Sequence, residues 1–223
     1  MAGCFRKNTR VDRAVKKPSF IVEDYIPVNK FSRTGHARPD TLWIDMHWTG
    51  NGGQSAYGVR EYFAGLAGQD SDDDERDIYA GSNFVIDYAE DITLEIIPVH
   101  EVSYTAGGKM YTDWARDMMT HNFTSNAPTT MDEYGWHGHT PNWLCVSIEM
   151  CHPDDTGKFF GVTLGMAAQV CAWLISFYNL VGTSTIITHH LITGKLCPKW
   201  WVERPRELDI FRQQVSAVME LNE

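Results

Sequence analysis

The sequence predicts an α/β protein in which a single mixed central β-sheet is flanked by helices. Apolar segments with the two-residue period of strands alternate along the chain with segments that have the spacing of helices. No internal repeat and no Gly/Pro-rich linker divides the chain. With 223 residues, one domain can bury a complete hydrophobic core without disulfides or a structural metal.

The first predicted strand, Leu42–Trp48, ends just before a glycine-rich loop. Its apolar residues alternate with a more polar set that includes Asp45 and His47, so the two sets face opposite sides of the sheet. After the loop, Ser55 can cap a helix that runs to about Ala67.

Two further strands are predicted over Ser82–Tyr88 and Ile92–Val99. The tight turn between them indicates a hairpin. The acidic cluster from Asp70 to Asp77 precedes them and is interpreted as an exposed loop. Calcium ligation is the alternative, although the cluster has no Gly or terminal Glu at the spacing that a calcium loop needs.

The middle of the chain, residues 105–141, is rich in Gly, Thr, Asn, Pro and His. A structureless stretch of this length is usually functional or contains short helices, and Asp113–Met119 is the candidate helix. A strand is expected next, over Leu144–Cys151, with Glu149 on its more polar face.

The C-terminal part is predicted to contain a long helix, a strand and a last helix. The segment Phe159–Thr188 has no charged residue and is long enough to span a membrane. However, the apolar residues of Leu164–Tyr178 recur on one helical stripe, which indicates a buried core helix that ends near Leu180. A strand over Ser184–Thr188 and a helix from about Trp200 to Leu221 complete the prediction.

The charge is acidic overall and unevenly distributed. The formal net charge of −10 argues against nucleic acid as the main partner. Residues 1–20 hold six Lys or Arg and one Asp, which gives +5 for this head and leaves −15 for residues 21–223. The head has no apolar segment behind it, so it is not a secretory signal. It is interpreted as a basic N-terminal tail, either frayed or acting as an electrostatic anchor for an anionic surface.

The cysteines do not form a disulfide framework, because their number is odd and their spacing irregular, and synthesis in a reducing cytosol is expected. They are Cys4, Cys145, Cys151, Cys171 and Cys197.

The segment Thr188–Pro198 carries the sharpest chemical signal. A short loop can bring Cys197 and one of the two histidines, His189 or His190, to a single zinc ion. An imidazole and a thiolate together are ligands that suit zinc. The alternative is a chance His pair and a cysteine that serves as a small core residue. His47 would supply a third ligand, and three protein ligands with one open position are typical of catalytic zinc. Such an ion lowers the pKa of water and polarises carbonyls.

Two further side chains are candidates for the chemistry. Glu149 lies within an apolar strand, where a carboxylate is costly unless it has a partner or a function, and it can act as the general base. The alternative is a glutamate at an edge or facing solvent. Lys195, two residues before Cys197, can stabilise an oxyanion, and the alternative is an exposed loop lysine.

An ordered series of segments along the chain carries a family resemblance. The series is Tyr25–Gly35, Ile44–Asn51, Ser82–Asp87, Ile97–Gly107, Val146–Cys151 and the cluster around His189 and Cys197. Together these segments resemble the zinc-dependent N-acetylmuramoyl-L-alanine amidases, and most of all the phage and prophage endolysins of Gram-positive hosts. The resemblance covers roughly residues 25–200.

The resemblance implies the fold shared by these amidases and the peptidoglycan recognition proteins, with one Zn²⁺ held by two His and one Cys or Asp. The matching ligands are His47, His189 and Cys197. His189 is chosen over His190 because the family's second ligand stands eight residues before its thiolate ligand. The family's catalytic glutamate matches Glu149, and its lysine two positions before the last ligand matches Lys195.

The chain departs from its relatives at two positions. A coliphage lysozyme and the peptidoglycan recognition proteins use a tyrosine where this chain has Ser82. Since Glu149 is present, we expect an enzyme of the glutamate type. Endolysin relatives often have a His where this chain has Thr105. His137 and His139 are alternative substrate contacts, or exposed loop residues, and His190 is expected to neighbour the metal ligands.

The function that the resemblance implies is hydrolysis of the amide bond between N-acetylmuramic acid and L-alanine in peptidoglycan. Residues 21–223 would be the zinc amidase catalytic domain. Its partner would be peptidoglycan, through the glycan strand and the stem peptide. Neither a nucleic-acid partner nor a membrane-spanning segment is expected. The protein would be made in the cytoplasm and act on the cell wall after release. The alternatives are a non-catalytic peptidoglycan-binding module and an amidase of soluble muropeptides.

Overall fold

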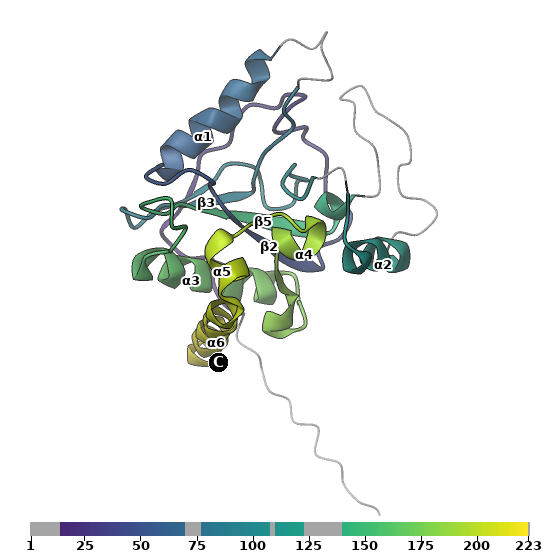
Figure 1. Cartoon of the computed structure of the whole chain (residues 1–223). Helices are drawn as coiled ribbons and strands as arrows, with labels where there is room; N and C mark the ends of the chain where they lie inside the picture. The colour runs from purple at the N-terminus through teal and green to yellow at the C-terminus, as the bar shows by residue number, and fades with distance from the viewer. Residues whose placement is uncertain (1–13, 70–76, 108–109, 123–139, 223) are drawn as a thin grey trace, which may run out of the picture.

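The computed structural model describes residues 14–69, 77–107, 110–122 and 140–222 (Figure 1). Several sequence-based predictions therefore fall outside the described residues. These are Cys4, His137, His139, most of the acidic cluster, most of the basic tail and much of the 105–141 segment.

The centre of the molecule is a six-stranded sheet with the strand order β1-β4-β3-β5-β2-β6. Within the described part of the chain, only the β3–β4 pair of this sheet is antiparallel and all other neighbouring strands are parallel, so the predicted mixed sheet is confirmed. The strands are β1 (Ile21–Glu23), β2 (Trp43–Trp48), β3 (Phe84–Ile86), β4 (Thr93–Glu95), β5 (Cys145–Met150) and β6 (Ile186–Thr188).

Helices cover both faces of the sheet, with α1 on one side and α3, α5 and α6 on the other (Figure 1). The α-helices are α1 (Ala56–Gly65), α2 (Asp113–Asn122), α3 (Gly161–Phe177), α4 (His189–Thr193), α5 (Lys199–Glu203) and α6 (Pro205–Leu221). Short 3₁₀ turns are η1 (Leu66–Gly68), η2 (Pro141–Trp143) and η3 (Gly182–Thr185).

Two hydrophobic clusters follow from this layering. The larger one lies between the sheet and α3, and includes Ile44, Ile148 and Leu174. The second lies under α1 and includes Val59 and Phe63. The α3 segment is thus a core helix, as its apolar spacing predicted. No helix in the described ranges is long and apolar enough to cross a membrane.

The predicted last helix is wrong in one respect, because the chain forms two helices there instead of one. The break lies at Arg204, whose φ of −137° and ψ of 72° are not helical. The cause is Pro205, since a proline disfavours helical geometry in the preceding residue and has no N–H to donate. Pro205 instead occupies the first turn of α6, where its missing donor costs nothing.

Among the described strands and α-helices, β1 and α4 were not predicted. The three-residue strand β1 pairs with β4 and is too short to show a period. The short helix α4 replaces the expected loop: the Thr188 side chain accepts a hydrogen bond from the Leu191 N–H, and Gly194, at φ 77°, ends the helix.

The residues just before β1 lie against the body of the domain. The Val15 N–H donates to Oγ of Ser176, and Nζ of Lys17 lies 2.7 Å from Oε2 of Glu95. Glu95 is buried, so Lys17 compensates a carboxylate removed from water.

Candidate metal centre and active site

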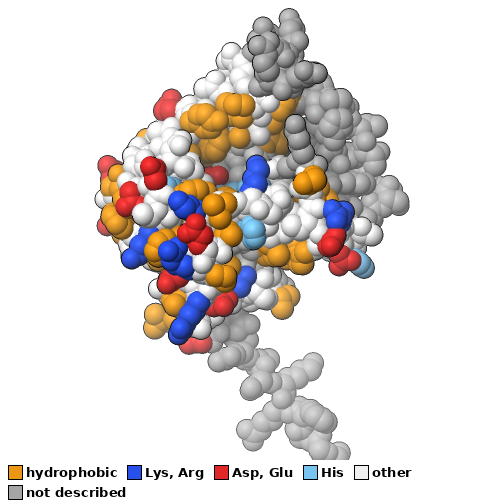
Figure 2. Space-filling model, in the orientation of Figure 1, with side chains coloured by type: hydrophobic (Ala, Val, Ile, Leu, Met, Phe, Trp, Pro, Cys, Tyr) orange, Lys and Arg blue, Asp and Glu red, His pale blue; other side chains and the backbone are white. Residues whose placement is uncertain are grey.

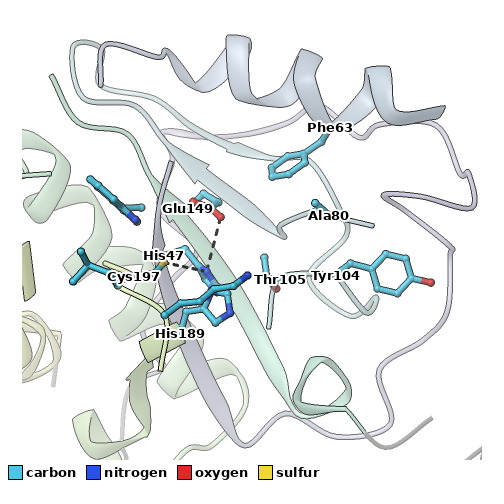
Figure 3. Close-up of a pocket in the computed structure, with 12 residues that line it drawn as sticks. His47, Phe63, Ala80, Tyr104, Thr105, Glu149, His189 and Cys197 are labelled. Atoms are coloured by element: carbon cyan, nitrogen blue, oxygen red, sulfur yellow. Dashed lines mark hydrogen bonds and ion pairs between the residues drawn. The ribbon is translucent and has the colours of Figure 1, made fainter. Parts of the chain in front are cut away.

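His47, His189 and Cys197 meet at the carboxyl ends of β2 and β6 (Figure 3). His47 is near the end of β2, His189 is the first residue of α4 directly after β6, and Cys197 lies in the loop before α5. One potential ligand atom of each residue, a ring nitrogen or the sulfur, lies within 4.8 Å of those of the other two, and the three residues are buried. The distance from Nδ1 of His47 to Sγ of Cys197 is 3.7 Å. The three residues that the sequence suggested as metal ligands therefore come together.

The local chain path explains how His189 and Cys197 meet. After α4 ends at Gly194, the chain turns back, and the His190 N–H donates to the Cys197 carbonyl at 2.9 Å. The His190 ring is exposed and bonds through Nδ1 to the Lys195 carbonyl at 2.7 Å. His190 thus supports the loop between the ligands, and its ring points to the backbone instead of the metal group.

The buried donor atoms fit a metal ion. Nε2 of His189 is buried and has no hydrogen-bond partner among the described residues. Burial and the nearby positive charges of His47 and Lys195 lower the pKa of His189 to about 2, so its ring is neutral and its lone pair is available. Burial raises the pKa of Cys197 and His47 opposes this, while a bound cation favours the thiolate. Two imidazoles and a thiolate are a typical zinc donor set.

Asp45 stands behind His47 and was missed as a site residue. Oδ2 of Asp45 lies 2.7 Å from Nε2 of His47, on the side of the ring away from Cys197. Burial alone would lower the pKa of His47. The charges of Asp45 and Cys197 raise it by more, so the pKa of His47 lies well above its usual value. Asp45 precedes His47 by two residues on one strand face, and this spacing was the signal that could have identified it.

Glu149 lies directly beside His47 in the sheet. The β2–β5 register pairs these two residues, and Oε1 of Glu149 is 4.0 Å from Nδ1 of His47. Strand β5 has neighbours on both sides and the Glu149 side chain is 12% exposed, so Glu149 is neither on an edge strand nor open to solvent. Burial raises its pKa to about 7, with a smaller increase from Asp45 and an opposing effect of His47. A carboxyl with this pKa can both accept and release a proton near neutral pH.

A pocket of about 380 Å³ is lined by His47, His189 and Cys197. Glu149 and the exposed Lys195 line the same pocket. The other walls come from distant parts of the chain, namely Trp48, Phe63, Ala80, Gly81, Tyr104, Thr105 and Leu196. Figure 2 shows this hollow beside α1, with hydrophobic side chains gathered over that helix.

A second hollow of about 290 Å³ adjoins the first. Phe63 and Glu149 line both hollows, and Tyr62 and Gln54 line the second. The Glu149 side chain thus stands between two adjoining depressions.

The two positions at which the chain departs from its relatives have different environments. Ser82 is buried and its Oγ bonds to the Phe84 carbonyl and Ser147, so it does not line the pocket. Thr105 does line the pocket, and its N–H donates to Oδ1 of Asn142.

Comparisons with known proteins identify similar chains. A family model described as N-acetylmuramoyl-L-alanine amidase matches residues 37–200. A probable N-acetylmuramoyl-L-alanine amidase of Bacillus licheniformis is 29% identical over 201 residues, covering 89% of this chain and 48% of its own length. The N-acetylmuramoyl-L-alanine amidase BlyA of Bacillus subtilis (strain 168) is likewise 29% identical over 201 residues, covering 90% and 48%. The chain therefore spans about half the length of the curated relatives it matches.

A solved structure has the same fold. The mutant endolysin from Bacillus subtilis superposes with a TM-score of 0.56 at 18% identity, covering 87% of this chain and 97% of that chain. At this level of identity, the likeness concerns the architecture of the sheet and its helices.

Proposed function

This chain belongs to the N-acetylmuramoyl-L-alanine amidase family, and from that premise we propose that it hydrolyses the amide bond between N-acetylmuramic acid and L-alanine in bacterial peptidoglycan. The observation that carries the proposal is the meeting of two histidines, a cysteine and a buried glutamate in one pocket. The protein would act on the cell wall after leaving the cytoplasm, with the glycan strand and its stem peptide as its partner.

The metal of this site would be one Zn²⁺. Nδ1 of His47, Nε2 of His189 and Sγ of Cys197 would hold it, because these buried donors match the ligands that zinc prefers. When bound, zinc supplies Lewis-acid polarisation of the scissile carbonyl and lowers the pKa of water. Three protein ligands leave a coordination position for chemistry.

Glu149 would be the general acid and base. Its carboxylate accepts a proton from the attacking water and then delivers that proton to the nitrogen of the leaving L-alanine. The pKa of about 7 supports both steps, because the two protonation states are then similar in energy at neutral pH.

Lys195 would stabilise the negative charge that develops on the carbonyl oxygen. Its ammonium group lines the same pocket, and its charge contributes to the lowered pKa of His189. The hollow beyond Glu149 supports a substrate that continues past the reacting amide, as a glycan strand with its peptide does.

A wall-digestion assay tests the proposal. Purified protein is incubated with purified Gram-positive cell wall, with a chelator, and with chelator followed by added Zn²⁺, and the products are identified by mass. We expect new amino-terminal L-alanine and peptide-free glycan, loss of both with chelator, and their return with zinc.

The same assay separates the alternatives. Binding to the wall without any new alanine amino groups would indicate a non-catalytic module and contradict the proposal. Cleavage of small soluble muropeptides with no action on intact wall would indicate a different substrate for the same chemistry.

A further inference from the structure

Asp45 is a completely buried carboxylate that the proposed chemistry does not use. Its exposed fraction is 0%, and its Oδ1 atom has no hydrogen-bond partner among the described residues. Removing a carboxylate from water is costly, so a buried one is normally held by a charged or hydrogen-bonding partner. The partner here is the ring of His47, at 2.7 Å between Oδ2 and Nε2.

The strand geometry makes this contact specific. Asp45 and His47 are two residues apart on β2, so their side chains leave the same face of the sheet. The residue paired with Asp45 on β5 is Ser147, whose hydroxyl and N–H bond to Asn83 and Ser103. The carboxylate of Asp45 is therefore directed at the histidine.

The two nitrogens of His47 have different roles in this arrangement. Nε2 faces Asp45, whereas Nδ1 faces Sγ of Cys197 at 3.7 Å and Oε1 of Glu149 at 4.0 Å. A histidine that binds a metal is a neutral imidazole with one ring proton, and a ring that donates this proton from Nε2 has its lone pair on Nδ1. The contact with Asp45 thus directs the lone pair of His47 into the pocket.

We propose that Asp45 is a positioning residue of the metal centre, which accepts the Nε2–H of His47, holds the ring with Nδ1 toward the pocket and thereby tightens zinc binding. The inference rests on the zinc site of the proposed function and deepens it. Carboxylates that orient a histidine ligand typically change metal affinity by about 10- to 100-fold.

The test compares zinc affinity in Asp45→Val, Asp45→Asn and the full wild-type chain, by competition with a chromophoric chelator. Ser147→Ala is the matched control, because Ser147 is buried, lies beside Asp45 in the sheet and bonds to Asn83 and Ser103. We expect zinc to bind about 10- to 100-fold more weakly to Asp45→Val, and less weakly to Asp45→Asn, whose amide oxygen still accepts the hydrogen bond. Ser147→Ala should lower the unfolding temperature and bind zinc as the wild type does.

A spectroscopic measurement reports the hydrogen bond itself. In the zinc-loaded protein, the His47 ring proton on Nε2 should give a downfield resonance that exchanges slowly with water. It should move upfield in Asp45→Asn and remain unchanged in Ser147→Ala. If Asp45→Val fails to fold, Asp45→Asn and this resonance decide the question.

Equal zinc affinity in the wild type and both Asp45 variants would overturn the inference, as would zinc bound to Nε2 of His47. A wild-type protein that binds no zinc would overturn it together with the zinc site. All these measurements are made without substrate, so the absence of wall hydrolysis alone contradicts the proposed function and leaves the role of Asp45 standing.

Discussion

Replacing Glu149 by Gln should separate catalysis from metal binding. Gln keeps the shape of Glu149 but cannot accept a proton as a carboxylate does, and a general base contributes about 10²- to 10⁴-fold to a rate. We therefore expect hydrolysis of the wall amide to fall by that factor, which corresponds to about 3 to 5 kcal/mol in the activation free energy. Zinc should remain bound, since Glu149 is not one of the three grouped ligands.

The same substitution should increase the stability of the chelator-treated protein. Burial raises the pKa of Glu149 from 4.5 to about 7, so ionisation costs roughly 3 kcal/mol more in the folded state than in the unfolded state. Because this pKa is raised, the penalty is absent below pH ~4.5, grows as the pH approaches 7 and is complete above that. Gln does not ionise, so the variant should be more stable than the wild type by up to ~3 kcal/mol at pH 8, with little difference at pH 4.

Two assays test these expectations. Release of amino-terminal alanine from purified wall measures the rate, and urea unfolding at both pH values measures the free energy of unfolding. Glu220→Gln, an exposed glutamate near the end of α6, is the matched control and should change neither quantity. A Glu149→Gln protein that hydrolyses wall at the wild-type rate, or that is less stable at pH 8, would refute the reasoning.

Four other outcomes are expected. His47→Ala should lose both zinc, measured by metal analysis, and wall hydrolysis. Lys195→Met should retain zinc but hydrolyse wall about 10²- to 10³-fold more slowly, and an unchanged rate would exclude the oxyanion role. Lys17→Met should lower the free energy of unfolding by about 1–3 kcal/mol in urea titrations, because it leaves the buried Glu95 without its cation. An unchanged free energy of unfolding would mean that the Lys17–Glu95 pair does not stabilise the fold. Deleting residues 1–13, which include four Lys or Arg, should weaken sedimentation with wall at low salt but not at high salt.

The N-terminal deletion stops at residue 13 for a structural reason. The sequence alone suggested a basic tail of 20 residues, but Val15 and Lys17 contact the body of the domain. Removing these residues would also change stability, and weaker wall binding would then have two explanations.

The larger strands and helices could be predicted because their patterns are local. The alternation in Leu42–Trp48 and Leu144–Cys151 indicated the strands that became β2 and β5, and the apolar spacing after Phe159 indicated α3. The short elements β1 and α4 could not be predicted in the same way. They have three and five residues, too few to display a period, and depend on pairing with β4 and on the cap at Thr188.

The sequence by itself determined the chemical types of the site: two histidines and a cysteine suited to zinc, a glutamate in an apolar strand, and a lysine beside the last ligand. Only the tertiary structure decided which atoms meet. The β2–β5 register brings Glu149 beside His47, and the packing of β2 buries Asp45 against the same ring. The pocket walls likewise combine Phe63 of α1 with Tyr104 and Thr105. Spacing along the chain specifies which face a side chain occupies, but a contact between distant segments exists only once strand order, register and helix packing are set.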